Sequence, residues 1–521
     1  MIHMIIFNPA IRPVLAVAVT MAASALIFIT GDHIHRNARE AITFIAAFLN
    51  CALIMSLVPA VLAGEEMRFS LLEIVKGVEL AFNPDPAGMV FACVSSSLWI
   101  LTSLYSTGYM RGHHEKNQTG YFAAFAMCIS AATGICFAAN LITFFIFFEI
   151  LTVATYPLVV HYRDETGRRS GRKYLAYTLI SGQLFFAGIV IVYWLTGTME
   201  FRAGGFIKTD LLPLPLMVVL FFLMAGAGMV KAGVMPFHSW LPAAMVAPTP
   251  VSALLHAVAV VKAGAFAVIR VSFFVFGPDT LKACGAARIL SWFAVATILI
   301  SSFIAMKQDN LKARLAFSTV GQLSYIVLGI CILSVYSIAG AMFHMVAHAF
   351  LKITLFMCAG AIFVTTGLSQ ISTMGDLAKR MPVTCVCFTA ASLGIAGLPL
   401  MAGFISKFNI LQGALTMGKP MFIAVLMAAA LLALSYLIPV VRIFFGIESS
   451  SQTASCTAAE PGHVHSSSGF DAAPAMLIPL VLTTVVAIIL GCFPDAGTHL
   501  YDMAVMAAEE IMGEGGIYLA G

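Results

Sequence analysis

The residues best suited to chemistry stand on one short apolar segment. Positions 342–360 read MFHMVAHAFLKITLFMCAG, in which His344, His348 and Lys352 follow one another at intervals of four. A helix brings every fourth residue to the same face, so this spacing predicts three titratable side chains in a row. Such a row could pass protons from group to group. Paired histidines could also bind a metal or haem, although no carboxylate or cysteine on that face completes a metal site.

Five further ionisable residues interrupt other apolar segments. Glu149 and Lys231 are predicted to pair, because a carboxylate holds a buried lysine in its charged form and its withdrawal favours release of the proton. His256 and Lys262 share a segment but stand six residues apart, on different sides of a helix. Lys407 completes the series. Simpler explanations exist. Glu149 could be a structural partner of a buried basic residue, His256 could be an ordinary core residue, and a lysine could extend its ammonium to the membrane interface.

The rest of the chain is strongly apolar. Hydrophobic residues make up 60% of the 521 residues, charged residues 10%, and the mean hydropathy is +0.97. Soluble domains carry about 25% charged residues, so this composition predicts a membrane-embedded protein. A charge at the bilayer centre costs at least about 2.5–3.5 kcal/mol, and buried ionisable residues are therefore usually functional.

Apolar runs long enough to cross a bilayer, about 20 residues each, recur from end to end. They predict an all-α polytopic membrane protein with about fourteen transmembrane helices. The predicted spans are 9–30, 40–63, 84–108, 120–138, 141–162, 174–196, 213–235, 245–276, 287–306, 314–334, 337–364, 383–410, 421–446 and 474–494.

Basic residues concentrate in alternate loops. With the N-terminus outside, the inner loops hold the densest groups, at 36–39, 111–116, 163–173, 307–314 and 379–380. The positive-inside tendency then predicts that both termini lie outside the cell inner membrane.

Two of the predicted spans contain helix breakers beside a lysine. Gly233 and Pro236 follow Lys231, and Pro399 precedes Lys407. Broken backbone at membrane depth is tolerated only where protein or a water-filled cavity satisfies it. Matching breaks in two halves of a chain predict a transport site, with two ordinary kinks as the alternative.

Several passages, in a consistent order, resemble a known family. They are FFEILTVATYPLV around Glu149, KAGVMPFHSWLPAAMVAPTPVSALLHA from Lys231, LKARLAFSTVGQLSYI, HMVAHAFLK, and GLPLMAGFISKF around Lys407. Together they resemble the antiporter-like membrane subunits of respiratory complex I, of Mrp-type cation/proton antiporters and of membrane-bound hydrogenases. The similarity extends from about residue 85 to residue 446.

The resemblance implies two inverted five-helix repeats, each with a broken helix. The expected divisions are 1–119 (three N-terminal helices), 120–276 and 287–446 (the repeats), 447–473 (a polar loop), and 474–521 (the last helix and tail). It also implies roles for the titratable residues: Glu149 and Lys231 as the central pair, His256, His344, His348 and Lys352 as the relay, and Lys407 at the exit. Lys262 resembles the Mrp and hydrogenase members more than complex I.

The implied function is proton translocation, or cation/proton antiport, within a multisubunit complex. The expected partners are other membrane subunits, with iron–sulfur, hydrogenase or quinone-reducing subunits in a redox-driven complex. The expected ion is H⁺, with Na⁺ as the alternative, and no cofactor, metal or nucleic acid is expected. Three alternatives stay open: a secondary Na⁺/H⁺ antiporter subunit without redox partners, a quinone or haem redox subunit, and a structural membrane anchor.

Overall fold

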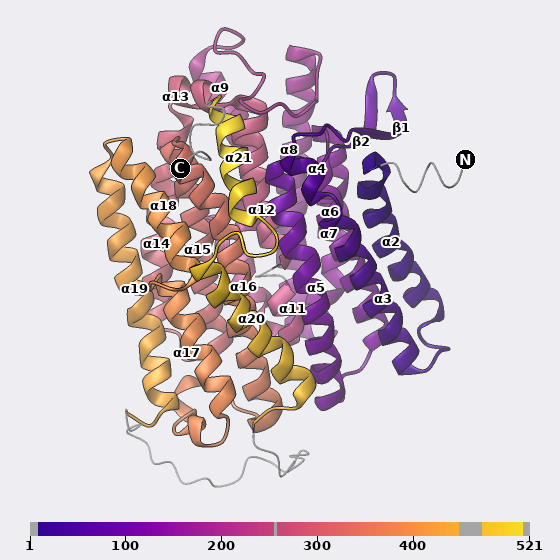
Figure 1. The fold of residues 1–521 in the computed structure, drawn as a ribbon, viewed down its shortest axis with the longest axis vertical. Helices are drawn as coiled ribbons and strands as arrows, with labels where there is room; N and C mark the ends of the chain where they lie inside the picture. Colours follow the sequence, from indigo (N-terminus) through magenta and orange to yellow (C-terminus); the bar gives the residue numbers. More distant parts are fainter. Residues whose placement is uncertain (1–8, 255–257, 448–470, 514–521) are drawn as a thin grey trace.

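The computed structural model describes residues 9–254, 258–447 and 471–513, which form an elongated bundle of helices (Figure 1). Within these residues, 12 helices are long and apolar enough to cross a membrane, or 13 if the bent pair Val260–Phe276 and Pro278–Cys284 is one span. The predicted multi-pass helical fold is confirmed. The number fourteen and the inverted repeats stay predictions.

The longer helices are α2 (Arg12–Thr30), α3 (Arg36–Met55), α5 (Pro86–Gly112), α6 (Gln118–Phe137), α7 (Leu141–Val159), α8 (Glu165–Thr196), α9 (Leu214–Ala232), α12 (Val260–Ile269), α14 (Ala286–Met306), α15 (Leu311–Ile332), α16 (Val335–Thr366), α17 (Pro382–Ala396), α18 (Ala402–Thr416), α19 (Pro420–Phe444), α20 (Pro474–Cys492) and α21 (Leu500–Met512). The short elements are η1 (Pro9–Ile11), α4 (Val58–Leu62), η2 (Phe237–Ser239), α10 (Trp240–Ala243), η3 (Ala244–Val246), α11 (Thr249–Ala253), the π-helical η5 (Arg270–Phe276), α13 (Pro278–Cys284), η6 (Ile371–Thr373) and η7 (Leu377–Lys379), with strands β1 (Phe69–Val75) and β2 (Val78–Phe82).

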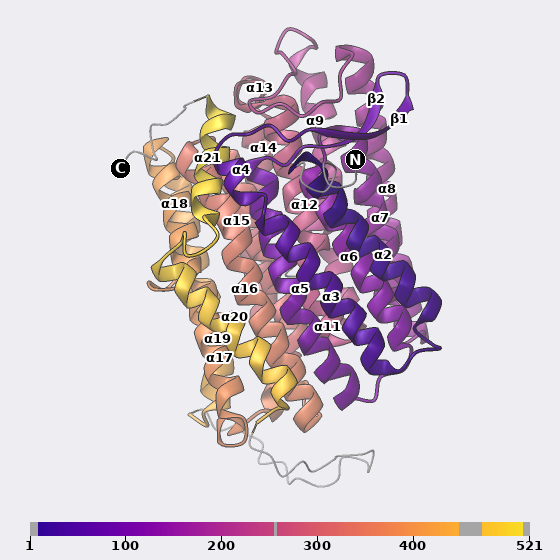
Figure 2. The same ribbon diagram turned by 45° about the vertical axis from the view of Figure 1, so that its right-hand side comes forward.

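The centre of the bundle is formed by α15 and α16. In each of these helices 94% of the most apolar stretch is buried inside the protein, against 33% in α19 and 39% in α8. Figures 1 and 2 show α16 running through the middle of the bundle, with α5, α17, α18 and α20 around it. Apolar side chains left exposed on outer helices such as α8 and α19 suit contact with lipid.

Two predicted spans are each divided between two helices. The predicted span 245–276 contains α11, which ends at Ala253, and α12, which begins at Val260 after the backbone leaves helical geometry at Ala259 (φ −107°, ψ −82°). Pro248 and Pro250 at the start of α11 account for a new helix beginning there, because proline lacks the amide hydrogen that a helix interior needs. The second broken span, 383–410, consists of α17 and α18.

Glycines end the helices at both lysine-bearing breaks. Gly233 follows α9 with φ +72°, and Gly397 follows α17 with φ +93°. This left-handed backbone is disfavoured for residues with a Cβ atom and commonly terminates helices. The predicted breaks beside Lys231 and Lys407 are therefore confirmed as helix ends.

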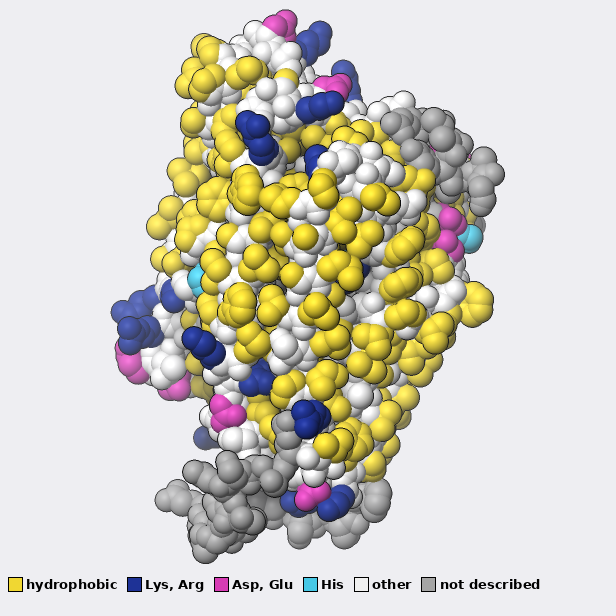
Figure 3. All heavy atoms as spheres, turned by 90° about the vertical axis from the view of Figure 1, so that its left-hand side faces the viewer, with side chains coloured by type: hydrophobic (Ala, Val, Ile, Leu, Met, Phe, Trp, Pro, Cys, Tyr) yellow, Lys and Arg dark blue, Asp and Glu magenta, His cyan; other side chains and the backbone are white. Residues whose placement is uncertain are grey.

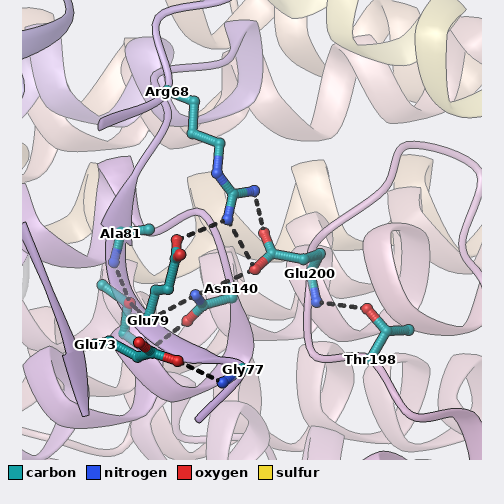
Figure 4. A network of polar contacts seen from close by, with 9 residues as sticks. Arg68, Glu73, Gly77, Glu79, Ala81, Asn140, Thr198 and Glu200 are labelled. Atoms are coloured by element: carbon teal, nitrogen blue, oxygen red, sulfur yellow. Dashed lines mark hydrogen bonds and ion pairs between the residues drawn. The ribbon is translucent and has the colours of Figure 1, made fainter. Parts of the chain in front are cut away.

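A β-hairpin, which the sequence did not predict, closes one end of the bundle. Strands β1 and β2 pair antiparallel, and Arg68 just before β1 forms ion pairs with Glu79 (3.3 Å) and Glu200 (2.6 Å) (Figure 4). Asn140 donates to the backbone carbonyl of Glu79 (2.8 Å) and also caps α7. The hairpin is thus tied to the start of α7 and to the loop that follows α8.

Charged side chains gather toward the two ends of the bundle, and hydrophobic ones cover the surface between them (Figure 3). We call the end opposite the hairpin the basic end. It is formed by the loops 31–35, 113–117, 160–164, 307–310 and 367–381 together with the helix termini beside them. The apolar belt between the ends has the character of a membrane-embedded surface.

Candidate functional site

Lys231 lies in the last turn of α9 and is fully buried. Its Nζ donates a hydrogen bond to the carbonyl of Phe148 on α7 (2.5 Å) and lies 3.2 Å from the centre of the Phe148 ring. The carboxyl end of a helix and the face of an aromatic ring both favour a cation. Both features reduce the cost of keeping the buried ammonium charged.

Glu149 follows Phe148 on α7, so the structure brings it close to Lys231. The two interact electrostatically, yet among the described residues they form no ion pair shorter than 4 Å. The Oε1 atom of Glu149 is buried and has no hydrogen-bond partner within the described protein. A Cβ atom at Gly182 of α8 would lie 2.1 Å from Oε1, so this glycine makes the space for the carboxylate.

Lys262 connects α12 to the centre of α16. Its Nζ lies 2.8 Å from Nδ1 of His348, and both side chains are almost completely buried. Close packing of α9 on α12 brings this lysine near the Lys231 region, because a Cβ atom at Gly264 would lie 2.8 Å from the carbonyl oxygen of Gly228. His256, the other residue predicted on this segment, lies outside the described residues.

The three residues predicted on one face of α16 lie in sequence along that helix, but each contacts a different neighbouring helix. The rings of His344 and His348 are 6.1 Å apart. His344 shares a hydrogen bond with Ser406 of α18 (2.8 Å), whereas Lys352 donates to Ser318 Oγ of α15 (2.7 Å) and to the carbonyl of Leu315 (3.1 Å). The row therefore has branches rather than forming a single line.

Lys407 sits in α18, just beyond the second break. Its Nζ donates to the carbonyls of Ile395 (2.6 Å) and Ala396 (3.2 Å), which are the last two residues of α17. These carbonyls have no partner within their own helix, so the lysine closes the helix end. Its predicted exit role is untested by this geometry.

Tyr325 of α15 joins Lys407 to His344, and the sequence did not point to it. Its ring stacks on the His344 imidazole, with ring centres 5.7 Å apart, and Lys407 Nζ lies 4.7 Å from the ring centre. The buried hydroxyl has no hydrogen-bond partner within the described residues. The sequence could have pointed to Tyr325 in one way: it is a polar aromatic residue in an apolar helix, within a passage that resembles the family.

The contacts give a continuous buried row: Lys262, His348, His344, then Ser406 and Tyr325, and finally Lys407. Lys231 stands on α9, which packs closely on the helix that carries Lys262, and Lys352 stands one turn beyond His348 on α16. Two polar atoms along it lack a hydrogen-bond partner within the described protein, Tyr325 Oη and His344 Nε2. Buried polar atoms of this kind are normally satisfied by ordered water, which also conducts protons between side chains.

A separate buried ion pair lies near the hairpin end. Asp85 stands just before α5 and caps this helix by accepting a hydrogen bond from Gly88 N (2.8 Å). It also forms a bidentate ion pair with Arg270, whose side chain is 1% exposed and packs among Phe201, Phe266 and Phe274. This pair fixes η5 to the start of α5.

The family profile described as NADH:quinone oxidoreductase/Mrp antiporter, TM, matches residues 138–433. The N subunit of the NADH-quinone oxidoreductase of Desulforudis audaxviator is 32% identical over 375 residues, which cover 70% of this chain and 72% of that protein. A probable K⁺/H⁺ antiporter protein of Rhizobium meliloti is 31% identical over 369 residues, 70% of this chain but only 36% of its own length. The L subunit of the F420H2 dehydrogenase of Methanosarcina mazei is 27% identical over 456 residues, 79% of this chain and 63% of that protein.

Solved structures show the same fold at lower sequence identity. A chain of an archaeal membrane-bound sulfane sulfur reductase superposes with a TM-score of 0.83 at 21% identity, covering 96% of this chain and 97% of its own. A chain of the Mrp complex from Dietzia sp. gives 0.83 at 20% identity, with coverages of 97% and 98%. A chain of respiratory complex I from Thermus thermophilus gives 0.76 at 20% identity, with coverages of 96% and 99%. All three are subunits of multisubunit membrane complexes.

Proposed function

Because the chain belongs to the family of NADH:quinone oxidoreductase and Mrp antiporter transmembrane subunits, we propose that it translocates protons, alone or in exchange for a cation, within a multisubunit membrane complex. The observation that carries the proposal is the buried row from Lys262 through His348 and His344 to Lys407. Burying titratable side chains inside a membrane protein costs free energy, so a connected series of them indicates a function, and proton transfer is the function that suits it.

Control of the row comes from Glu149 and Lys231. Lys231 now donates to the carbonyl of Phe148, one residue before Glu149, so a small shift of α7 exchanges one partner for the other. With the carboxylate close, the ammonium keeps its proton; with it distant, the buried amine favours losing it. A partner protein that moves α7 would in this way drive proton transfer into the row.

The proposed membrane is the cell inner membrane, with the basic end facing the cytoplasm and both chain ends outside. The relatives carry names of both redox enzymes and cation/proton antiporters, so either driving force fits the fold. A mild-detergent pull-down of this chain with identification of its partners separates the two. Iron–sulfur, hydrogenase or quinone-reducing subunits indicate redox drive, and small membrane subunits alone indicate antiport.

The test uses the intact complex in membrane vesicles, with internal pH followed by a trapped dye. Lys231→Met and Glu149→Gln should each abolish proton movement while the complex still assembles. Lys379→Met removes a lysine that is 77% exposed at the basic end, and it should have no effect. Normal transport by both buried-site variants would refute the proposed mechanism.

A further inference from the structure

A second cluster of titratable side chains lies at the basic end, away from the buried row. Its centre is Glu115, whose side chain is only 5% exposed although it stands on a loop. Tyr162 donates a hydrogen bond to Oε1 (2.7 Å), His113 Nδ1 lies 3.2 Å from the same oxygen, and His161 Nε2 lies 3.6 Å from Oε2. Two loops, 113–117 and 160–164, thus bring two histidines to one carboxylate.

The charge of this carboxylate is well defined. Burial raises the pKa of Glu115, but the Tyr162 hydrogen bond and the neighbouring imidazoles of His161 and His113 outweigh it, and the pKa is lowered from its ordinary 4.5. Glu115 therefore stays ionised at neutral pH and places a negative charge beside both imidazoles. Tyr109 of α5, Tyr121 of α6 and Lys312 of α15 are further titratable groups within electrostatic range of Glu115.

Two cavities are bordered by members of the cluster or by residues next to them. One of about 250 Å³ is bordered by His161, Tyr121 and Arg163. Another of about 60 Å³ is bordered by Lys312 and by Phe363, whose ring stacks on His113 at 5.3 Å. A cavity of about 10–15 Å³ already holds one water molecule, so each can connect the cluster to the medium through water.

The cluster also leads inward, to the broken segment between α9 and α12. Lys312 Nζ donates to the carbonyl of Ala247 (3.0 Å), two residues before α11 begins. Tyr109 stands on α5, and this helix packs against α11, whose first residue is Thr249. The Oγ1 atom of Thr249 is buried and has no hydrogen-bond partner within the described residues. This broken segment carries Lys231 on one side and Lys262 on the other.

We propose that Glu115, His113 and His161 form the site at which the basic end exchanges protons with the medium, and that Tyr109 and Lys312 connect it to the broken segment. The histidines carry the proton, and Glu115 supplies the fixed negative charge. The inference rests on the proposed function, because the cluster supplies the protons that the buried row translocates.

The experiment compares Glu115→Gln with the native chain in the intact complex, in vesicles whose basic end faces the medium. A trapped pH dye reports proton movement driven by the complex's own energy source, in a weakly buffered medium and in one strongly buffered by an impermeant zwitterionic buffer. We expect a severalfold slower rate in weak buffer and recovery of the native rate in strong buffer, because abundant buffer molecules replace the lost collecting site. Glu165→Gln, which removes a carboxylate 80% exposed at the same end, should match the native chain in both media.

Buffer dependence separates this role from a structural one. Equal slowing in both media, or no slowing in weak buffer, would overturn the proposal. If Glu115→Gln does not assemble, His161→Gln carries the same test, since it leaves the carboxylate and Tyr162 in place. Lys231→Met is measured in the same two media. If Lys231→Met is inactive while Glu115→Gln shows no dependence on buffer, the exchange site is rejected and the proposed mechanism stands. If Lys231→Met is fully active, the proposed mechanism is rejected.

Discussion

The two helix breaks that carry a lysine use that lysine in different ways. At the first, Lys231 reaches sideways to the carbonyl of Phe148 on α7, beside a carboxylate. At the second, Lys407 reaches back across its own break to the two last carbonyls of α17. One sequence pattern, a glycine and proline break beside a lysine, therefore produces a lysine that can change partners and another that closes its own helix.

This difference predicts that Lys231 matters mainly for transport and Lys407 mainly for stability. A buried ammonium held by a neighbouring helix contributes little to the fold, because the cost of burying it offsets its contacts. An ammonium that satisfies two otherwise unpaired carbonyls contributes directly to the fold. The following substitutions test the contrast, from the largest expected effect to the smallest.

Lys231→Arg should lower the proton translocation rate by roughly 100-fold, the scale of losing a positioned acid–base group. Arginine keeps the positive charge but does not release its proton in proteins. The rate is measured in vesicles containing the intact complex. Native activity in this variant would mean that Lys231 acts only as a fixed charge.

Gly182→Ala should slow transport severalfold without removing any titratable group. The added Cβ atom would lie 2.1 Å from Glu149 Oε1, so the carboxylate must move relative to Lys231. Gly226→Ala is the matched control, because a Cβ atom there meets nothing within 4 Å. Equal rates for the two alanine variants would argue against a control function for the Glu149 position.

Lys407→Met should destabilise the protein, whereas Lys231→Met should not. Loss of the ammonium leaves the carbonyls of Ile395 and Ala396 unpaired, which costs about 1–3 kcal/mol of unfolding free energy. The apparent Tm in detergent measures the effect for both variants. A larger fall in Tm for Lys231→Met would reverse the comparison.

Tyr325→Phe should have the smallest effect, less than about twofold on the transport rate, because the ring makes the contacts with His344 and Lys407. Tyr325→Leu removes the ring and should slow transport further. If the phenylalanine variant is as slow as the leucine variant, the hydroxyl rather than the ring connects the two residues.

The sequence predicted what depends on neighbours along the chain. Apolar length located the spans, and the spacing of four placed His344, His348 and Lys352 along one helix. It could not predict which helices would meet them, because Lys262 and His348 lie 86 residues apart and His344 and Ser406 lie 62 apart. Residues without a charge, such as Tyr325 and Gly182, gain their importance only from packing.

The same limit applies to the span 245–276 and to Asp85. Hydropathy stays high across 245–276, so it does not show that helical geometry is lost at Ala259. The local pattern around Asp85 accounts for its capping of α5, which the structure shows. Its second partner, Arg270, lies 185 residues away.

The ion pair between Arg68 and Glu200 can form only after a large part of the chain has been synthesised. These residues are 132 positions apart, with α5, α6, α7 and α8 between them. Since a chain is synthesised from its N-terminus, the hairpin has no such partner until the loop after α8 has emerged and been delivered to the same side of the membrane. Closure of this link therefore marks the stage of biogenesis at which the first six long helices have been inserted in the correct orientation.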